Sequence, residues 1–357
     1  MRLCSILGVL GCAGLLALSS CSPRSTDLRT LAPADALIYL QTNDLGAALR
    51  PLAESRAAQA IDGSRPDFSS FDGVQLAIVV TGFDTSEKKL NEEQSSAQVK
   101  PNFVAITDTH AWHFQAVRFA EEKLGSLVAK FYGDKPQMDD PEHNGGRDIT
   151  WTAADGRKAF AFVIGSVVYF SNDRASLDKV LTVRSGAANL ASTGKAASSG
   201  GALATGYVSQ NGIGQLSDLV AIRVAAAGSE DPQVRSGVAS VLPPLAREMV
   251  AEVRWSADME EGKVVDTYDI TIPESVRSAL VDGQVDDLNL RLRNAVFALL
   301  RDSKLDEKTS AEVADIVASV ASSGAGDQTT FTPTGLQRKT ASESGLIGQI
   351  VLQFSGG

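Results

Sequence analysis

Short apolar runs alternate with polar turns along much of the chain, a pattern typical of antiparallel strands. The stretch RDITWTAADGRKAFAFVIGSVVYFS (147–171) predicts a three-stranded meander, because two glycine-containing turns separate three runs rich in Ile, Val and Phe. The runs VQLAIVV (74–80) and FVAIT (103–107) predict a strand pair before it, and residues 250–257 and 264–272 predict another pair much later. Strands therefore occur in both halves of the chain.

Helical patterns lie between these strands. The stretch ALIYLQTNDLGAALRPLAE (36–54) predicts a strand followed by a helix, because Asn43 and Asp44 can accept hydrogen bonds from the free amides of the first turn. Further helices are predicted near 111–131, 286–302 and 308–322. Strands and helices together predict a mixed fold.

A weak internal repeat relates the two halves. Shifting the sequence by 168 residues pairs Tyr39 with Tyr207, Asn43 with Asn211 and Gly46 with Gly214, so strand, cap and helix recur in the same order. Near the ends of the halves, IGQIVLQFS (347–355) resembles IGSVVYFS (164–171) with one extra residue, which a strand can accommodate as a bulge. We expect an α+β fold of two related units, each a largely antiparallel sheet packed by helices.

The first residues have a different character. A single cation, Arg2, precedes an apolar stretch from Leu3 to Leu18, as in an export signal. The stretch ends in Leu18-Ser19-Ser20-Cys21, which resembles the lipobox of bacterial lipoproteins, in which the cysteine is acylated and becomes the first residue. By the same resemblance, Ser22 favours the outer membrane, facing the periplasm. The alternative is an uncleaved transmembrane anchor, although about 18 residues would barely cross a bilayer.

These patterns divide the chain into five segments. They are a signal peptide (1–20), a lipidated tether (21–33), the first unit (34–184), a linker (185–202) and the second unit (203–357). The linker is rich in Gly, Ala and Ser, which bury too little apolar surface to order firmly. Two other polar stretches, 84–101 and 133–147, are predicted to form long loops.

Composition excludes several classes of protein. Hydrophobic residues at 43% and charged residues at 21% indicate a globular chain. The net charge of −10 becomes −11 when Arg2 leaves with the signal, and this argues against nucleic acid as a partner. Cys4 and Cys12 lie within the signal and Cys21 is the predicted acylation site. The mature chain then has no thiol for a disulfide, a thiolate zinc site or a cysteine nucleophile.

Two glycine-rich stretches raise the question of nucleotide binding. In NGIGQLSD (211–218), Gly212 and Gly214 have the spacing of a dinucleotide-binding loop, but Ser217 replaces the third glycine, so helix capping explains the stretch better. In STGKAASSGG (192–201), the earlier glycine and the magnesium-binding hydroxyl of a phosphate loop are missing. We therefore predict no cofactor.

The three histidines, His110, His113 and His143, all lie in the first half. Two of them have helical spacing, and Asp139, Asp140 or Glu142 could complete a divalent-metal site if the loop folded back. The adjoining helix has core spacing over Phe114, Val117, Ala120, Leu124 and Phe131. Since no metal signature and no Gly-x-Ser-x-Gly elbow is present, we predict surface or boundary histidines, no metal site and no catalytic residue.

The opening of the mature chain, Pro33-Ala34-Asp35-Ala36-Leu37-Ile38-Tyr39, resembles the repeats of uncharacterised families of anchored bacterial envelope proteins. The resemblance implies a non-catalytic role. We expect a protein that is held to the membrane by its lipid and that binds or scaffolds a protein partner in the envelope. One alternative is binding of a lipid or other hydrophobic ligand in an apolar cavity. Another is a hydrolase that uses the histidines.

Overall fold

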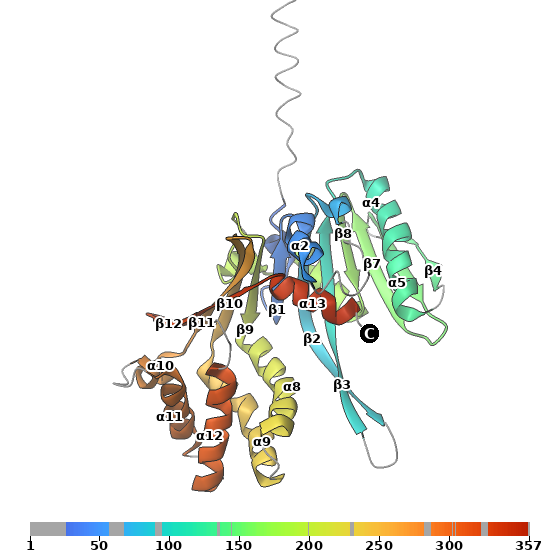
Figure 1. Cartoon of the computed structure of the whole chain (residues 1–357). Coiled ribbons are helices and arrows are strands. Elements are labelled where there is room, and N and C mark those ends of the chain that lie inside the picture. The colour runs from blue at the N-terminus through green and yellow to red at the C-terminus, as the bar shows by residue number, and fades with distance from the viewer. Residues whose placement is uncertain are drawn as a thin grey trace, which may run out of the picture.

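The computed structural model describes residues 26–355, except 57–67, 90–94, 134–135, 144, 199, 229–231, 282–286, 302, 304 and 323–327. Within this part of the chain, thirteen strands form one antiparallel sheet on which the helices pack (Figure 1). The fold is therefore α+β, as the sequence predicts. The predicted signal peptide and Cys21 lie outside the described residues.

The strands of the first unit include one long hairpin. They are β1 (Ile38–Thr42), β2 (Gln75–Lys89), β3 (Ser95–Asp108), β4 (Gln137–Asp139), β5 (Glu142–His143), β6 (Gly146–Thr152), β7 (Lys158–Ile164) and β8 (Val167–Ser171). The strands of the second unit are β9 (Ala204–Ser209), β10 (Glu252–Glu260), β11 (Lys263–Thr271), β12 (Gln328–Thr332) and β13 (Gly335–Ser342).

Helices form most of the connections. In the first unit they are η1 (Leu28–Leu31), α2 (Leu45–Glu54), η2 (Ser69–Phe71), α4 (His113–Phe119), the π-helical turn η3 (Ala120–Leu124), α5 (Gly125–Tyr132), α6 (Arg174–Thr182) and η4 (Val183–Ser185). From there on they are α7 (Leu190–Thr193), α8 (Gln210–Gly228), α9 (Pro232–Met249), α10 (Glu274–Val281), α11 (Leu288–Leu300), α12 (Glu307–Ser322) and α13 (Gly345–Ser355).

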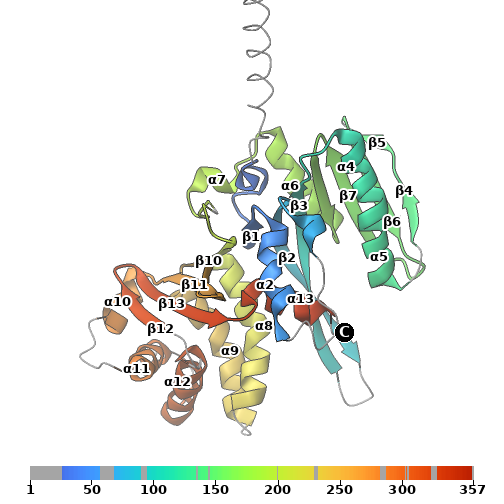
Figure 2. The same cartoon turned by 45° about the horizontal axis from the view of Figure 1, so that its top comes forward.

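The sheet repeats one strand order on either side of its middle. Outward from β1 the neighbours are β2, β3, β8 and β7, and outward from β9 they are β10, β11, β13 and β12. The first strands of the two units pair with each other, with Tyr39 opposite Tyr207. The sequence repeat is therefore a repeat of topology, and the two units share one sheet (Figure 2).

In both units a helix begins soon after the first strand, and a polar side chain accepts a hydrogen bond from its first turn. Asp44 caps α2 by accepting a hydrogen bond from the N–H of Ala47 at 2.9 Å, as predicted. In the second unit the predicted cap, Asn211, lies inside α8, and Ser209 instead accepts from the N–H of Gly212 at 3.1 Å. A Cβ on Gly212 would lie 2.3 Å from the carbonyl oxygen of Leu37. Glycine at this position therefore lets α8 approach β1.

The first unit is packed on both faces of its strands. On one face, Tyr39, Val104 and Tyr169 form a core with Leu177 of α6 and Leu28 of η1. On the other face, α4 and α5 cover a second core whose strand residues are Ile149, Trp151, Ala159, Ala161, Val163 and Val168. Neighbouring residues of β8, Val168 and Tyr169, belong to opposite cores because side chains alternate along a strand.

The sequence predicts a strand at 347–355, but these residues lie in helix α13. A short apolar run does not distinguish strand from helix by periodicity, and the local hydrogen bonds decide for helix here. Gly345 N–H donates to the Ser342 hydroxyl and Leu346 N–H donates to the buried carboxylate of Asp266, both at 2.9 Å. Topology instead matches β8 with β13 and α6 with α13.

The two predicted long loops contain strands. The stretch 84–101 extends β2 and β3 into a hairpin, in which Asp84 pairs with Lys100 and Lys89 with Ser95. The stretch 133–147 includes β4 and β5, which both pair with β6 at the sheet edge. Polar residues form these strands because the ladder satisfies their backbone groups without requiring an apolar face.

The predicted linker and tether are more ordered than their composition suggests. In the linker, Leu190 and Ala196 are buried in the core of the first unit, and Asn189 bridges to Pro33. In the predicted tether, Leu28 and Ala32 are fully buried. A few apolar side chains are enough to order these segments because they dock on a core that the sheet already provides. Residues 26–33 of the predicted tether are therefore part of the fold.

The prediction that Phe114 and Phe131 lie on the core face of the helix at 111–131 is wrong. Ala116, Ala120 and Val128 are buried, whereas Phe114 is 69% and Phe131 is 58% exposed. The π-helical turn η3 inserts one extra residue and rotates the helix after it, so a face extrapolated at 3.6 residues per turn fails beyond Leu124.

Candidate functional site

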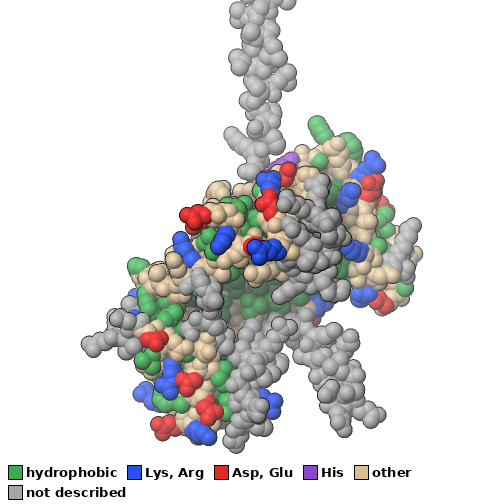
Figure 3. Space-filling view, in the orientation of Figure 1, with side chains coloured by type: hydrophobic (Ala, Val, Ile, Leu, Met, Phe, Trp, Pro, Cys, Tyr) green, Lys and Arg blue, Asp and Glu red, His purple; other side chains and the backbone are tan. Residues whose placement is uncertain are grey.

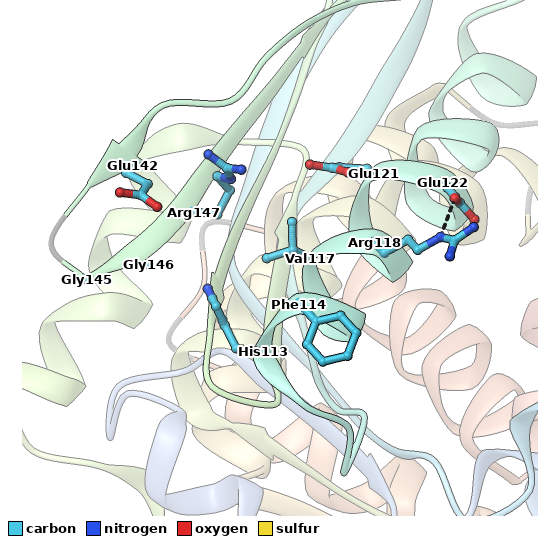
Figure 4. Close-up of a pocket in the computed structure, with 10 residues that line it drawn as sticks. All are labelled: His113, Phe114, Val117, Arg118, Glu121, Glu122, Glu142, Gly145, Gly146 and Arg147. Atoms are coloured by element: carbon cyan, nitrogen blue, oxygen red, sulfur yellow. Dashed lines mark hydrogen bonds and ion pairs between the residues drawn. The ribbon is translucent and has the colours of Figure 1, made fainter.

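Two hollows differ in chemistry and belong to different units. The first is an open cleft of about 890 Å³ between α4 and the hairpin of β5 and β6 (Figure 4). Its lining is His113, Phe114, Val117, Arg118, Glu121, Glu122, Glu142, Gly145, Gly146 and Arg147. Charged side chains therefore dominate its walls.

Ion pairs already engage much of this charge. Arg118 Nε lies 2.7 Å from Glu122 one helical turn later, and Arg147 Nε lies 3.8 Å from the carboxylate of Asp140. Figure 4 shows Glu121 pointing from the helix toward Arg147 on the facing strand. In the described part of the chain, no three His, Cys, Asp or Glu residues stand together as a metal site would require. The cleft is a polar surface with mixed charges.

The histidines have separate surroundings. His113 Nδ1 lies 3.3 Å from the carbonyl oxygen of Gly165, which can only accept, so this nitrogen is the donor in that contact. His110 has a backbone φ of 51°, and its Nδ1 lies 3.5 Å from Asp108. Both imidazoles therefore contact the loops at the ends of β3 and β7. The side chain of His143 lies outside what the structure describes.

A buried carboxylate connects the start of the described chain to the turn before α4. Asp108 accepts hydrogen bonds from the hydroxyl of Thr26 and from the N–H of His110. Burial opposes ionisation of this carboxyl, but these bonds and one from Ser166 hold its pKa below the ordinary value. Thr26 is also held by Gln75, whose side chain bonds both its N–H and its carbonyl. This end of the chain is fixed at the end of β3.

The glycine-rich stretches serve the fold. The stretch 211–218 is the first part of α8, where Gly212 packs on Leu37 and Gly214 faces Arg247. In the stretch 192–201, Gly194 ends α7 with a φ of 65°. The predicted capping role of 211–218 is wrong, because these residues lie inside α8 and Ser209 accepts the hydrogen bond from Gly212 instead.

The second hollow is an apolar cavity of about 240 Å³ in the second unit. Helices α9, α11 and α12 form one wall and strands β11 to β13 form the other (Figure 1). Twelve of the fourteen lining residues are apolar: Leu242, Leu245, Ala246, Met249, Val250, Ile270, Ile272, Leu288, Leu292, Val296, Val317 and Leu336. No local pattern in the sequence indicates this cavity, because it depends on how three helices pack on one sheet.

Two polar residues complete the cavity lining. Thr329 of β12 and Arg338 of β13 face each other in the strand register, so they lie side by side on one wall. Pro243 and Pro244 lie inside α9, between the lining residues Leu242 and Leu245. Two successive prolines remove two backbone donors and disturb the helix just before Leu245 and Ala246 of the lining. The arrangement fits a small apolar group that has a polar end.

Large hydrophobic side chains are exposed mainly on the first unit. They are Trp112, Phe114, Leu127, Phe131 and Met138 there, with Met259, Leu290 and Phe297 in the second unit. Hydrophobic side chains gather at the upper end of the molecule over the start of α4 (Figure 3). None of the described helices combines the length and hydropathy that a membrane span requires. Phe114 also lines the first cleft, whereas none of the other exposed residues lines either hollow.

Comparisons with known proteins identify structural neighbours only. No family model matches the chain, and no curated protein sequence matches it. Among solved structures, crystal form III of the Treponema protein TP0453 covers 92% of this chain and 99% of its own, with 8% identity and a TM-score of 0.43. Crystal form I covers 92% and 98%, with 8% identity and a TM-score of 0.39. Similarity at this level assigns the chain to no family.

Proposed function

We propose that this protein is a lipid-anchored envelope protein that binds a small hydrophobic ligand in the cavity of its second unit. The observation that supports this function is the apolar lining, in which twelve residues of three helices, the sheet and their ends line a space of about 240 Å³. A dry apolar cavity of about 150 Å³ can hold a molecule the size of benzene. The ligand class is therefore a short acyl chain or a small ring system.

The polar pair gives the ligand an orientation. Thr329 and Arg338 lie on adjacent strands at one side of an otherwise apolar lining. A hydroxyl or carboxyl group on the ligand would satisfy its hydrogen bonds there while its apolar part fills the cavity. Partner binding was the first expectation from the sequence, and ligand binding is preferred here because the apolar lining of this cavity is the specific observation that favours it.

The first test is native mass spectrometry of residues 22–357, exported without the predicted acylation site and purified gently from the periplasm. A reproducible added mass that organic solvent extracts would support the proposal and identify the ligand. Ala246→Leu, which fills part of the cavity, should remove the added mass while preserving the fold. Ser240→Leu is the matched control, because Ser240 is an exposed residue of the same helix.

The lipid anchor has a separate test. The intact mass of the parent chain should show a new first residue at Cys21 with acyl chains attached, whereas Cys21→Ala should abolish this processing. A parent chain that retains residues 1–20 and remains in the membrane would instead show an uncleaved anchor and contradict the lipobox prediction.

A further inference from the structure

Two aromatic side chains project from the molecule where α4 begins. Trp112 is 76% and Phe114 is 69% exposed. The backbone of Trp112 is held in place because this residue is the N-cap of α4. Its backbone N–H donates to Gln115 Oε1 at 3.1 Å, and its carbonyl oxygen accepts from the backbone N–H groups of Gln115 and Ala116 at 2.8 and 3.0 Å. The fold therefore holds a large apolar surface out in solvent, which is costly unless another surface covers it.

The same end of the molecule holds the start of the described chain. Thr26 donates its hydroxyl to Asp108, and Asp108 accepts the N–H of His110, two residues before Trp112. Gln75 fixes the backbone of Thr26 on both sides. One buried carboxylate thus joins the point where the chain leaves the fold to the turn that presents the aromatic pair.

The length of chain beyond Thr26 limits what can cover this surface. Five residue steps separate Thr26 from Cys21, and a fully extended chain spans at most about 3.6 Å per residue, or roughly 18 Å in all. Acyl chains on Cys21 would hold this end of the molecule within that distance of a bilayer. A lipid surface is therefore the nearest large apolar phase available to Trp112 and Phe114.

We propose that Trp112 and Phe114 insert into the membrane interface and form a second contact beside the lipid anchor. The inference rests on the proposed acylation of Cys21. Tryptophan prefers the interface because its ring is apolar while its N–H bonds to water or head groups. Two membrane contacts also fix an orientation. Helices α9, α11 and α12 lie at the opposite end of the molecule, so this contact turns the ligand cavity away from the bilayer (Figure 1).

Tryptophan fluorescence can test the contact directly. The chain has three tryptophans, and Trp151 and Trp255 are at most 5% exposed, so Trp112 is the one that external quenchers reach. The acylated full chain is reconstituted into phosphatidylcholine vesicles with brominated acyl chains. We expect bromine to quench Trp112, iodide in the water to lose access to it, and Trp112→Phe to remove the bromine-sensitive fraction.

The matched control moves the probe along the same helix. Phe131 is 58% exposed and lies 17 residues after Phe114, about 26 Å along the helix axis. In the double variant Trp112→Phe, Phe131→Trp, the new tryptophan should be open to iodide and insensitive to bromine. Equal bromine quenching at both positions, or none at position 112, overturns the proposal. The intact mass is measured on the same sample, so a missing anchor is recognised separately from a missing aromatic contact.

Discussion

The two units have the same strand order but different helices between the third strand and the final hairpin. In the first unit that segment holds one helical run, α4 to α5, followed by β4, β5 and β6, and Trp112 and Phe114 are exposed at the start of the run. In the second unit it is the three helices α10 to α12, and two of these, with α9, enclose an apolar cavity. The two units thus share their strand order and differ in the segment after the third strand. The exposed aromatic pair and the apolar cavity both lie at or beside that segment.

The largest expected effect comes from breaking the centre of the repeat. Tyr39 is fully buried and its hydroxyl donates to Gln41 Oε1 at 2.6 Å. Tyr39→Ala should lower the free energy of unfolding by about 3–5 kcal/mol, as for other large aromatic truncations. Tyr207→Ala, its repeat partner, should also destabilise the protein strongly, since Tyr207 belongs to the same core. Urea denaturation followed by circular dichroism measures both.

Tyr39→Phe is the control for the aromatic truncation. It keeps the ring and removes only the hydrogen bond from the Tyr39 hydroxyl to Gln41, which should cost about 0.5–1.5 kcal/mol. A cost equal to that of Tyr39→Ala would mean that the hydrogen bond, and not the packing of the ring, stabilises the join between the units.

Matched leucine truncations compare the packed unit with the hollow one. Leu177 lies fully buried in the core of the first unit, and Leu292 lines the cavity of the second. Leu177→Ala should cost about 3–5 kcal/mol, because it creates a new cavity in close-packed surroundings. Leu292→Ala should cost about 2 kcal/mol, because it enlarges a space that already exists. Thermal denaturation of the ligand-free protein gives both values, and equal costs would show that the cavity closes in solution.

A smaller expected effect is the pH dependence of stability, which should differ between Asp108 and Asp266, the buried aspartates on the third strands of the two units. Hydrogen bonds hold the pKa of Asp108 below 3.8 despite its burial, so its ionised form stabilises the fold above that pH and the stabilisation is lost as the pH falls. Burial raises the pKa of Asp266 above 3.8, although Trp255 and Leu346 donate hydrogen bonds to it. Its contribution is therefore greatest in acid and is lost as the pH rises through the raised value.

Asparagine variants of the two aspartates test these opposite pKa shifts. Between pH 3 and 7, the melting temperature of Asp108→Asn relative to the parent should fall as the pH rises, whereas that of Asp266→Asn relative to the parent should rise. Parallel curves for the two variants would contradict the opposite directions of the two pKa shifts.

Much of the fold was predictable from local pattern. The meander ending at Ser171, the strand pairs and the helices near 286–302 and 308–322 follow from alternation, turn residues and periodicity. The errors occurred where distant contacts decide the outcome. Helix α13 is supported by Asp266, 80 residues before Leu346, and the linker is ordered by Leu190 within another segment's core. The apolar cavity depends on how three helices pack on the sheet, and the exposure of Phe131 depends on the π-helical turn before it, for which the sequence gives no periodic signal.

The central pairing of β1 with β9 has a consequence for the growing chain. Strand β1 can pair with β2 as soon as the first unit is complete, but its other edge waits for β9, whose Tyr207 lies 168 residues after Tyr39. Until then the first unit presents an open strand edge, which is a template for pairing with another chain. A chain truncated near residue 202 should therefore self-associate through β1, because the second unit covers this edge in the full chain.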